Sequence, residues 1–137
     1  MHCPCSKQID YSACCEPYHL GKIPENPLIL MKARYSAYAL KKLYYIEKTS
    51  HPKTFLLEDP LSFKKNIQEF CKITYFEGLY IHAFQEEGKK GYVTFTAKLS
   101  QNGIDASFQE KSLFLKEEGI WLYVEGEFSK EKKPVFD

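Results

Sequence analysis

The chain has 137 residues, a formal net charge of +1 and 44% hydrophobic residues, which suits one ordinary domain with a packed core. A charge this close to zero does not favour nucleic acid or an anionic lipid surface as a partner. No apolar stretch approaches the roughly eighteen residues of a membrane span, so we expect no membrane contact.

The most distinctive pattern lies at the start of the chain, where four of the five cysteines form two close pairs, Cys3-Pro4-Cys5 and Cys14-Cys15. Thiolate is a soft ligand that suits zinc, and four thiolates close a tetrahedron. The gap between Cys3 and Cys5 lets both sulfurs face one point across a tight turn. Adjacent Cys14 and Cys15 can diverge where a chain enters or leaves a helix. The pattern therefore predicts one zinc ion held by Cys3, Cys5, Cys14 and Cys15.

Disulfides are the alternative use of these cysteines, since four thiols allow three pairings. Bridges between adjacent or nearly adjacent cysteines would be strained, and no secretory signal precedes them. An intracellular chain keeps its thiols reduced, so we favour metal and expect a cytoplasmic protein. The sequence leaves open whether His2 or His19 replaces a cysteine ligand, although a solvated surface position is the simpler interpretation of each.

Two helices are expected after the cysteine segment. Asn26-Pro27 is typical of an N-cap followed by proline at the first helical position, and apolar residues then recur every three or four positions over 27–39. Residues 40–49 continue the helical pattern after a bend near Leu40. His51-Pro52 ends this helix, because the residue before a proline avoids helical backbone angles.

A third helix and four strands complete the pattern. Asp59-Pro60 begins a helix whose apolar face includes Cys71, a thiol that we interpret as a small buried hydrophobe. The period then changes to that of strands, with a loop predicted over 85–91 and a hairpin turn at Asn102-Gly103. The predicted strands span residues 73–84, 92–100, 104–115 and 120–126.

Helices first and antiparallel strands second indicate an α+β fold. We expect three N-terminal helices packed on one face of a curved four-stranded antiparallel sheet, with a small N-terminal zinc knob. The chain then divides into a zinc-binding segment at 1–25, an α+β domain at 26–128 and a charged flexible tail at 129–137. Because the first segment is too short for a core of its own, the metal would order it.

Four polar residues are candidates for a pocket between the helices and the sheet. Glu110 and Ser112 share one face of the third predicted strand with two phenylalanines, which is a costly place for an unpaired carboxylate. Arg34 of the first helix would pair with Glu110, and His51 at the end of the second helix would join them. The cluster is either a polar lock between helices and sheet or a ligand or acid–base site, and we favour the lock.

The cysteine pattern, with Tyr11 three residues before Cys14, resembles the SEC-C zinc motif found at the tail of the preprotein translocase ATPase SecA. Further blocks, from Pro17-Tyr18-His19 through Met31-Lys32-Ala33-Arg34-Tyr35 to Gly119-x-Trp121-x-Tyr123, resemble the bacterial YchJ family over nearly the whole chain. This resemblance implies a SEC-C motif joined to a domain similar to nuclear transport factor 2, whose helices and curved sheet form a cone. The chain departs from the usual SEC-C pattern at Ser6-Lys7, where Gly-Ser is common.

Two functions fit these features. In the first, the zinc knob is an adaptor that docks on another protein, as the resemblance to the SecA tail, which contacts the chaperone SecB, suggests. Its exposed contacts would be Lys7, Gln8, Tyr18 and Lys22. In the second, the cone binds a small molecule or acts as an enzyme, and the zinc segment is a lid or a brace. We favour the adaptor over the enzyme because a closed four-thiolate site leaves no position for a substrate.

Overall fold

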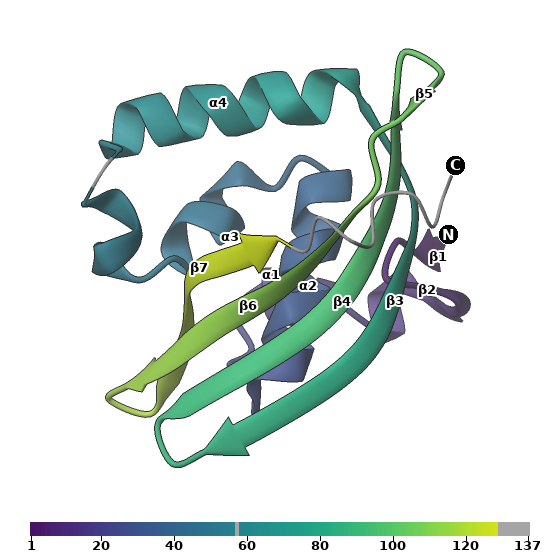
Figure 1. The fold of residues 1–137 in the computed structure, drawn as a ribbon. Helices are drawn as coiled ribbons and strands as arrows, with labels where there is room; N and C mark the ends of the chain where they lie inside the picture. The colour runs from purple at the N-terminus through teal and green to yellow at the C-terminus, as the bar shows by residue number, and fades with distance from the viewer. Residues whose placement is uncertain (57, 129–137) are drawn as a thin grey trace.

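The computed structural model describes residues 1–56 and 58–128, and the predicted tail over 129–137 lies outside the described residues. The described chain has the predicted α+β fold, in which long curved strands enclose a helical layer (Figure 1). Four α-helices and two short 3-10 turns stand where three helices were predicted. None of the described helices combines the length and apolar character needed to cross a bilayer.

The N-terminal cysteine segment folds as a small hairpin followed by two short helical turns. The first strand ends at Cys3, Pro4 and Cys5 make a tight turn, and the second strand returns antiparallel. The additional α-helix that was not predicted is α1 (Glu16–His19) in this segment, which has only 4 residues, too few to show an apolar period. The elements are β1 (His2–Cys3), β2 (Ser6–Asp10), η1 (Tyr11–Ala13) and α1 (Glu16–His19).

The longer helices begin where their capping residues predict. The Asn26 side chain accepts a hydrogen bond from the backbone N–H of Ile29 at 2.9 Å, and Asp59 caps the last helix in the same way. The bend predicted near Leu40 is a complete break, because Lys41 adopts a φ of 60°, which an α-helix cannot continue. These elements are α2 (Pro27–Ala39), α3 (Leu43–Lys48), η2 (Pro52–Phe55) and α4 (Pro60–Ile73).

The strands form one antiparallel sheet in the order β3-β4-β6-β7, with the short β5 paired to β4. Phe95 of β4 lies opposite Glu110 of β6, and Ser112 lies opposite Gly126 of β7. This register brings β6 to the middle of the sheet, so its inward side chains face the helices. The strands are β3 (Thr74–Glu87), β4 (Lys90–Gln101), β5 (Ile104–Asp105), β6 (Phe108–Glu117) and β7 (Ile120–Phe128).

The loop predicted over 85–91 is wrong, because the two strands continue almost to each other and only Gly88 and Lys89 connect them. Gly88 has a φ of 60°, which glycine adopts at low cost in a tight turn. The side chains at this end of the hairpin are exposed on both faces, so a charged composition is compatible with strands there.

The single strand predicted over 104–115 is also wrong, because it breaks at Ala106 and Ser107. The Ser107 hydroxyl accepts a hydrogen bond from the backbone N–H of Leu99 at 3.0 Å and lies 3.3 Å from the carbonyl of the same residue. The side chain thus replaces a rung of the strand ladder, which a pattern of apolar residues does not reveal.

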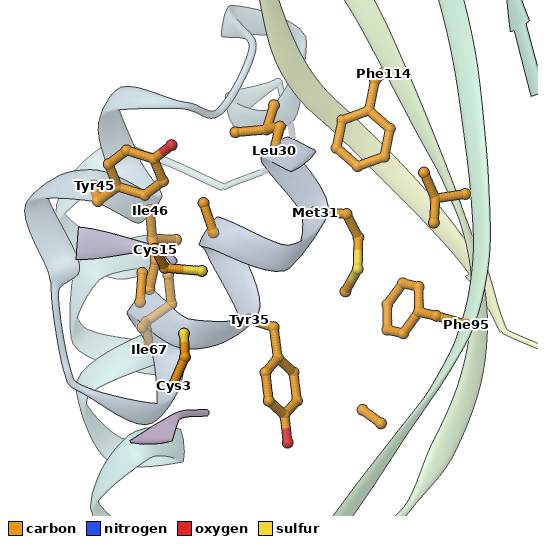
Figure 2. Close-up of a cluster of buried hydrophobic side chains, with 14 of the residues drawn as sticks. Cys3, Cys15, Leu30, Met31, Tyr35, Tyr45, Ile46, Ile67, Phe95 and Phe114 are labelled. Carbon is orange, nitrogen blue, oxygen red and sulfur yellow. The ribbon is translucent and has the colours of Figure 1, made fainter. Parts of the chain in front are cut away.

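Helix α2 is the centre of the molecule, and none of its 13 residues is exposed. One side faces the curved sheet, and the other faces the cysteine segment (Figures 1 and 2). Its first turn lies against β4, where a Cβ on Gly91 would come within 2.4 Å of a Pro27 ring carbon. Because α2 is shared in this way, it separates two candidate sites.

Candidate functional site

The first site is the cluster of four cysteine sulfurs, whose ligand atoms all lie within 4.8 Å of one another. The Sγ of Cys5 lies 3.7 Å from that of Cys3, 3.5 Å from that of Cys14 and 3.6 Å from that of Cys15. A tetrahedral site with Zn–S bonds of about 2.3 Å requires sulfurs about 3.8 Å apart. The residues present therefore fit a tetrahedral thiophilic metal such as zinc, and all five cysteines are free of disulfides.

Two local turns bring the sulfurs to one point. The hairpin turn holds Cys3 and Cys5 across Pro4, as the spacing predicts. Cys14 ends the 3-10 turn η1, and Cys15 is the N-cap of α1, so the chain reverses direction between two adjacent cysteines. This change of element is what allows neighbouring side chains to reach the same centre.

Helix α2 forms the inner wall of the cysteine site. Cys3 and Cys15 are buried, while Cys5 and Cys14 are partly exposed. The Ser36 hydroxyl of α2 lies 3.3 Å from the Sγ atoms of both Cys3 and Cys15. The Cys15 sulfur also lies 3.6 Å from the Lys32 carbonyl. A metal held here would be coupled to α2 through these outer contacts.

The protons of the cluster are shared unequally between the thiols. Hydrogen bonds from Cys15 and then Cys5 lower the pKa of Cys3, and the same contact with Cys3 raises the pKa of Cys15 well above its ordinary value. Four adjacent thiols thus do not ionise together without a cation among them. Metal binding displaces these protons, so the affinity rises with pH.

His19 is not part of this ligand set, because both ring nitrogens are occupied. Its Nε2 lies 2.8 Å from the Ala33 carbonyl, and its Nδ1 lies 2.7 Å from the Tyr11 hydroxyl. A carbonyl only accepts, so Nε2 carries the proton and Nδ1 accepts from the tyrosine. Burial lowers the pKa of His19 and keeps the ring neutral. The four sulfurs alone, without His2 or His19, form the metal-compatible cluster.

The second site is a cavity of about 590 Å³ on the opposite side of α2, between the helices and the sheet. Figure 2 shows Met31 of α2 extending toward Phe95 of β4, while Cys3 and Cys15 lie on the other side of the helix. Its walls are mainly aromatic and aliphatic, as is usual for small-molecule sites. The apolar lining comes from Met31, Tyr35, Tyr38, Phe63, Ile67, Phe70, Phe76, Phe95, Ala97, Leu99, Phe108, Phe114, Tyr123 and Phe128.

Arg34, Glu110 and Ser112 supply the buried polar groups of this cavity. Arg34 is held by Nη1, which donates to the Ile46 carbonyl at 3.0 Å and to the Thr49 hydroxyl at 2.8 Å. Its guanidinium carbon lies 4.4 Å from the ring centre of Tyr123, which is a cation–π distance. The helix α3 end therefore fixes the cation against the sheet.

The Glu110 carboxylate is held by its neighbours on β6 and β7. Its Oε2 accepts hydrogen bonds from the Ser112 hydroxyl at 2.5 Å and from the Tyr123 hydroxyl at 3.2 Å. Gly126 lies beneath it, where a Cβ would come within 2.0 Å of the same oxygen. Burial raises the pKa of Glu110, and these hydrogen bonds together with the charge of Arg34 oppose the rise.

The direct Arg34–Glu110 ion pair expected from the sequence is not among the salt bridges of the described residues, so no guanidinium nitrogen of Arg34 lies within 4.0 Å of a carboxylate oxygen of Glu110. His51 is not part of the lining either. Its Nε2 lies 3.2 Å from Glu117 Oε2, and its backbone N–H donates to the Tyr123 carbonyl. The chain between α3 and η2 pairs with β7 through Ser50 and Tyr123. The His51 imidazole therefore lies against Glu117 and does not line the cavity.

Tyr123 is the site residue that sequence reasoning missed. It connects the two charges, because its ring underlies Arg34 and its hydroxyl reaches Glu110. The alternation of residues in β7 allows either Trp121 with Tyr123 or Leu122 with Val124 to face inward. A register shift opposite Leu113 interrupts the alternation of β7, so Trp121 and Val124 are both buried. A bulge of this kind leaves no clear mark in the residue pattern.

The comparisons with known proteins agree with this arrangement. Residues 26–126 match the family model of the YchJ middle NTF2-like domain. The solution structure of a SEC-C motif containing protein from Rhodopseudomonas palustris is 32% identical, covers 95% of this chain and 100% of that chain, and superimposes with a TM-score of 0.82.

Two further solved structures extend the likeness. A SEC-C motif containing protein from Psychrobacter arcticus is 28% identical over 93% of this chain and 82% of that chain, with a TM-score of 0.76. An epoxide hydrolase of the LEH-like type from M. tuberculosis is 14% identical over 77% of this chain and 86% of that chain, with a TM-score of 0.56. At that identity the last likeness concerns the fold alone.

Proposed function

This chain belongs to the YchJ family, and from that premise we propose that it is a zinc-stabilised small-molecule binding protein. In this proposal the cysteine cluster holds one zinc ion and braces α2 from one side. The cavity on the other side of α2 takes a largely apolar molecule that carries one polar group. The large cavity reverses the preference for an adaptor that the sequence alone suggested.

The observation that carries the proposal is the cavity of about 590 Å³ with a few buried polar groups in a mainly apolar wall. Protein interiors are close-packed, and unfilled volume is destabilising by about 24 cal/mol per Å³ in core mutants. A core serving stability alone would therefore be filled. A volume of this size lies within the range of sites that bury a drug-sized ligand.

The zinc ion has a structural part in this proposal. Its four ligands are Cys3, Cys5, Cys14 and Cys15, and bound zinc would supply a rigid cross-link rather than reactive chemistry, because four thiolates leave no open coordination position. The contacts of Ser36 with two of the sulfurs tie that cross-link to α2. The position of the cavity wall thereby depends on the order of the cysteine segment.

The direct test fills the cavity from within. Ala97 of β4 lines the cavity and is 2% exposed, so Ala97→Trp would occupy part of its volume. The matched control is Ala83→Trp, at an exposed position of β3 outside the lining. We expect the zinc-loaded protein and the Ala83→Trp control to bind the neutral fluorescent probe N-phenyl-1-naphthylamine, and Ala97→Trp to bind it at least about tenfold more weakly. Equal binding by both folded variants, or by neither variant nor the wild type, contradicts the proposal.

A second candidate function is the adaptor, which is supported by apolar side chains on the outer surface of the cysteine segment. Ile9, Leu20 and Ile23 are 45%, 78% and 55% exposed. Several exposed apolar side chains on one short segment are a feature of protein interaction sites. Lys22 lies over the Tyr18 ring at 5.3 Å beside them. A protein partner would cover these residues and contact the nearby Lys7 and Gln8.

Charge reversal tests the adaptor without disturbing the metal. The double substitution Lys7→Glu and Lys22→Glu leaves all four sulfurs in place, so zinc content should be unchanged. We expect co-purification of tagged protein from its native host, followed by mass spectrometry, to lose the partner with this variant. Retention of the same partner at the same yield rejects the adaptor.

A further inference from the structure

The cavity holds a buried cation whose hydrogen-bonding capacity is only partly used. Arg34 is 5% exposed and lines the cavity. All of its hydrogen bonds within the described residues come from Nη1, to the Ile46 carbonyl, the Thr49 hydroxyl and the Ser50 hydroxyl. In the described part of the chain Nε and Nη2 donate no further hydrogen bond within 3.5 Å, although burial raises the pKa of the nearby Tyr38 hydroxyl and an interaction with Arg34 opposes that rise. These N–H groups are not among the fully enclosed unpaired atoms of the described residues, so they remain open to the cavity, where a ligand atom can accept from them.

No carboxylate of the described residues lies within ion-pair distance of this cation. Of the two carboxylates in the described lining, Glu58 and Glu110, only Glu110 is buried. It directs Oε2 to the Ser112 and Tyr123 hydroxyls instead. A buried cation without a paired anion is costly, and the Tyr123 ring at 4.4 Å offsets only part of that cost.

Resting on the proposed function of the cavity as a ligand site, we infer that the ligand is a monocarboxylic acid with an apolar body, whose carboxylate pairs with the unused N–H groups of Arg34. A guanidinium presents N–H groups in a fork that matches a carboxylate. The apolar body lies against the aromatic wall formed by residues such as Phe95 and Phe114.

The neighbouring groups select against other head groups. An amine would bring a second cation next to Arg34. An alcohol would leave the charge of Arg34 uncompensated. A phosphate, with up to two negative charges, would meet Glu110 and Glu58 without a second cation, because Arg34 is the one Lys or Arg side chain among the described lining residues. A single negative charge therefore fits the site best.

The experiment compares probes that share one apolar chain and differ only at the head. Decanoate, 1-decanol, decyltrimethylammonium and decyl phosphate each compete with N-phenyl-1-naphthylamine for the zinc-loaded full-length protein. We expect decanoate to displace the dye at a concentration at least about tenfold lower than 1-decanol, with the ammonium the weakest. A tighter fit of the alcohol, the ammonium or the phosphate overturns the carboxylate inference while leaving the cavity function standing. Displacement by none of the four overturns both.

Two variants locate the effect. Arg34→Met should lower the affinity of the protein for decanoate to its affinity for 1-decanol. Its affinity for 1-decanol should not change. Because Arg34 also anchors the end of α3, that variant is paired with Glu110→Gln, which keeps the side-chain shape and removes the competing negative charge. Glu110→Gln should raise the affinity for decanoate about three- to tenfold and leave the affinity for 1-decanol unchanged. Equal effects on acid and alcohol in both variants overturn the inference.

Discussion

The two sides of α2 treat their polar groups in opposite ways. On the cysteine side the candidate ligand groups all have partners, since the four sulfurs contact one another and both nitrogens of His19 are occupied, whereas the buried Tyr45 hydroxyl beside His19 has none among the described residues. On the cavity side only Nη1 of Arg34 donates hydrogen bonds within the described residues, and the volume around the guanidinium is not filled by side chains. A closed polar site orders a segment, whereas an open one is available to bind, so the contrast supports the proposed structural part of one side and the proposed ligand binding of the other.

The largest effect is expected from removing one sulfur. Zinc sites of this type contribute on the order of 10 kcal/mol to folding of the segment that they organise. Cys14→Ser should release the metal and remove hydrogen-exchange protection from residues 1–25, while the α+β domain stays folded. Metal analysis and exchange mass spectrometry measure both outcomes.

The control for the cysteine variant is Cys71→Ser, because the Cys71 thiol contacts the Tyr38 carbonyl at 3.2 Å and lies outside the cluster. It should retain one zinc ion per chain. A reduced, metal-free wild type whose first 25 residues are as protected as in the zinc form would show that the sulfurs do not hold the segment through metal.

A smaller effect is expected from Gly126→Ala, which tests the packing of the cavity side. The new Cβ would meet Glu110 Oε2, so the carboxylate must move and lose hydrogen bonds to Ser112 and Tyr123. We expect a loss of about 1–3 kcal/mol in unfolding free energy, measured with urea. In a Glu110→Ala background the same substitution should cost much less. Costs that are equal in both backgrounds would mean that the two residues do not interact.

Ser36→Ala tests whether α2 contributes to the zinc affinity of the cysteine cluster. Ser36 contacts two sulfurs, and outer contacts of this kind change metal affinity by about 10–100-fold. We expect the zinc affinity to fall about tenfold in competition with a chromophoric chelator. Ser12→Ala, whose hydroxyl contacts Asp10 on the surface, is the matched control. An affinity that is the same in both variants removes Ser36 from the metal site.

The smallest effect concerns the pH dependence of stability. Burial, opposed by hydrogen bonds and by Arg34, raises the pKa of Glu110 above its ordinary 4.5, so the folded state binds this proton more tightly than the unfolded state does. Its contribution to stability is therefore full below the ordinary pKa and is lost as pH rises through the folded pKa. Glutamine does not titrate.

The Tm of the wild type minus that of Glu110→Gln should therefore decrease as pH is raised from 4.5 toward neutrality. Metal loss at low pH affects both proteins alike and cancels in the difference. A difference that stays constant with pH, or that increases, would show that Glu110 is not buried as a proton-binding group.

The cysteine cluster was predictable because its four ligands are close in sequence. Two short spacings, each compatible with a local turn, were enough to suggest that Cys3, Cys5, Cys14 and Cys15 converge. The two-residue period of a strand likewise placed Glu110 and Ser112 on one face, and the structure lines the cavity with both. Such inferences rest on local geometry, which the sequence carries directly.

The long-range relations were harder to obtain. Arg34 and Glu110 line the same cavity, but no rule of spacing reveals that Tyr123 and Gly126 from β7 lie beside them. His51 is predicted to join them from the end of the second helix, whereas its backbone N–H bonds to β7 and its ring lies against Glu117. Cavity volume is also invisible in sequence, since a lining residue and a packed core residue have the same composition.

The burial of α2 on every side has a consequence for how substitutions will be tolerated. An ordinary surface helix, such as α4 with only Ile67 and Cys71 buried, accepts polar replacements along one stripe. Helix α2 has no such stripe, because Tyr35 faces the cavity and the next residue, Ser36, touches the sulfurs. A saturation scan of 27–39 should therefore show intolerance without a helical period, and replacements that alter zinc retention should alternate along the helix with replacements that alter ligand selectivity.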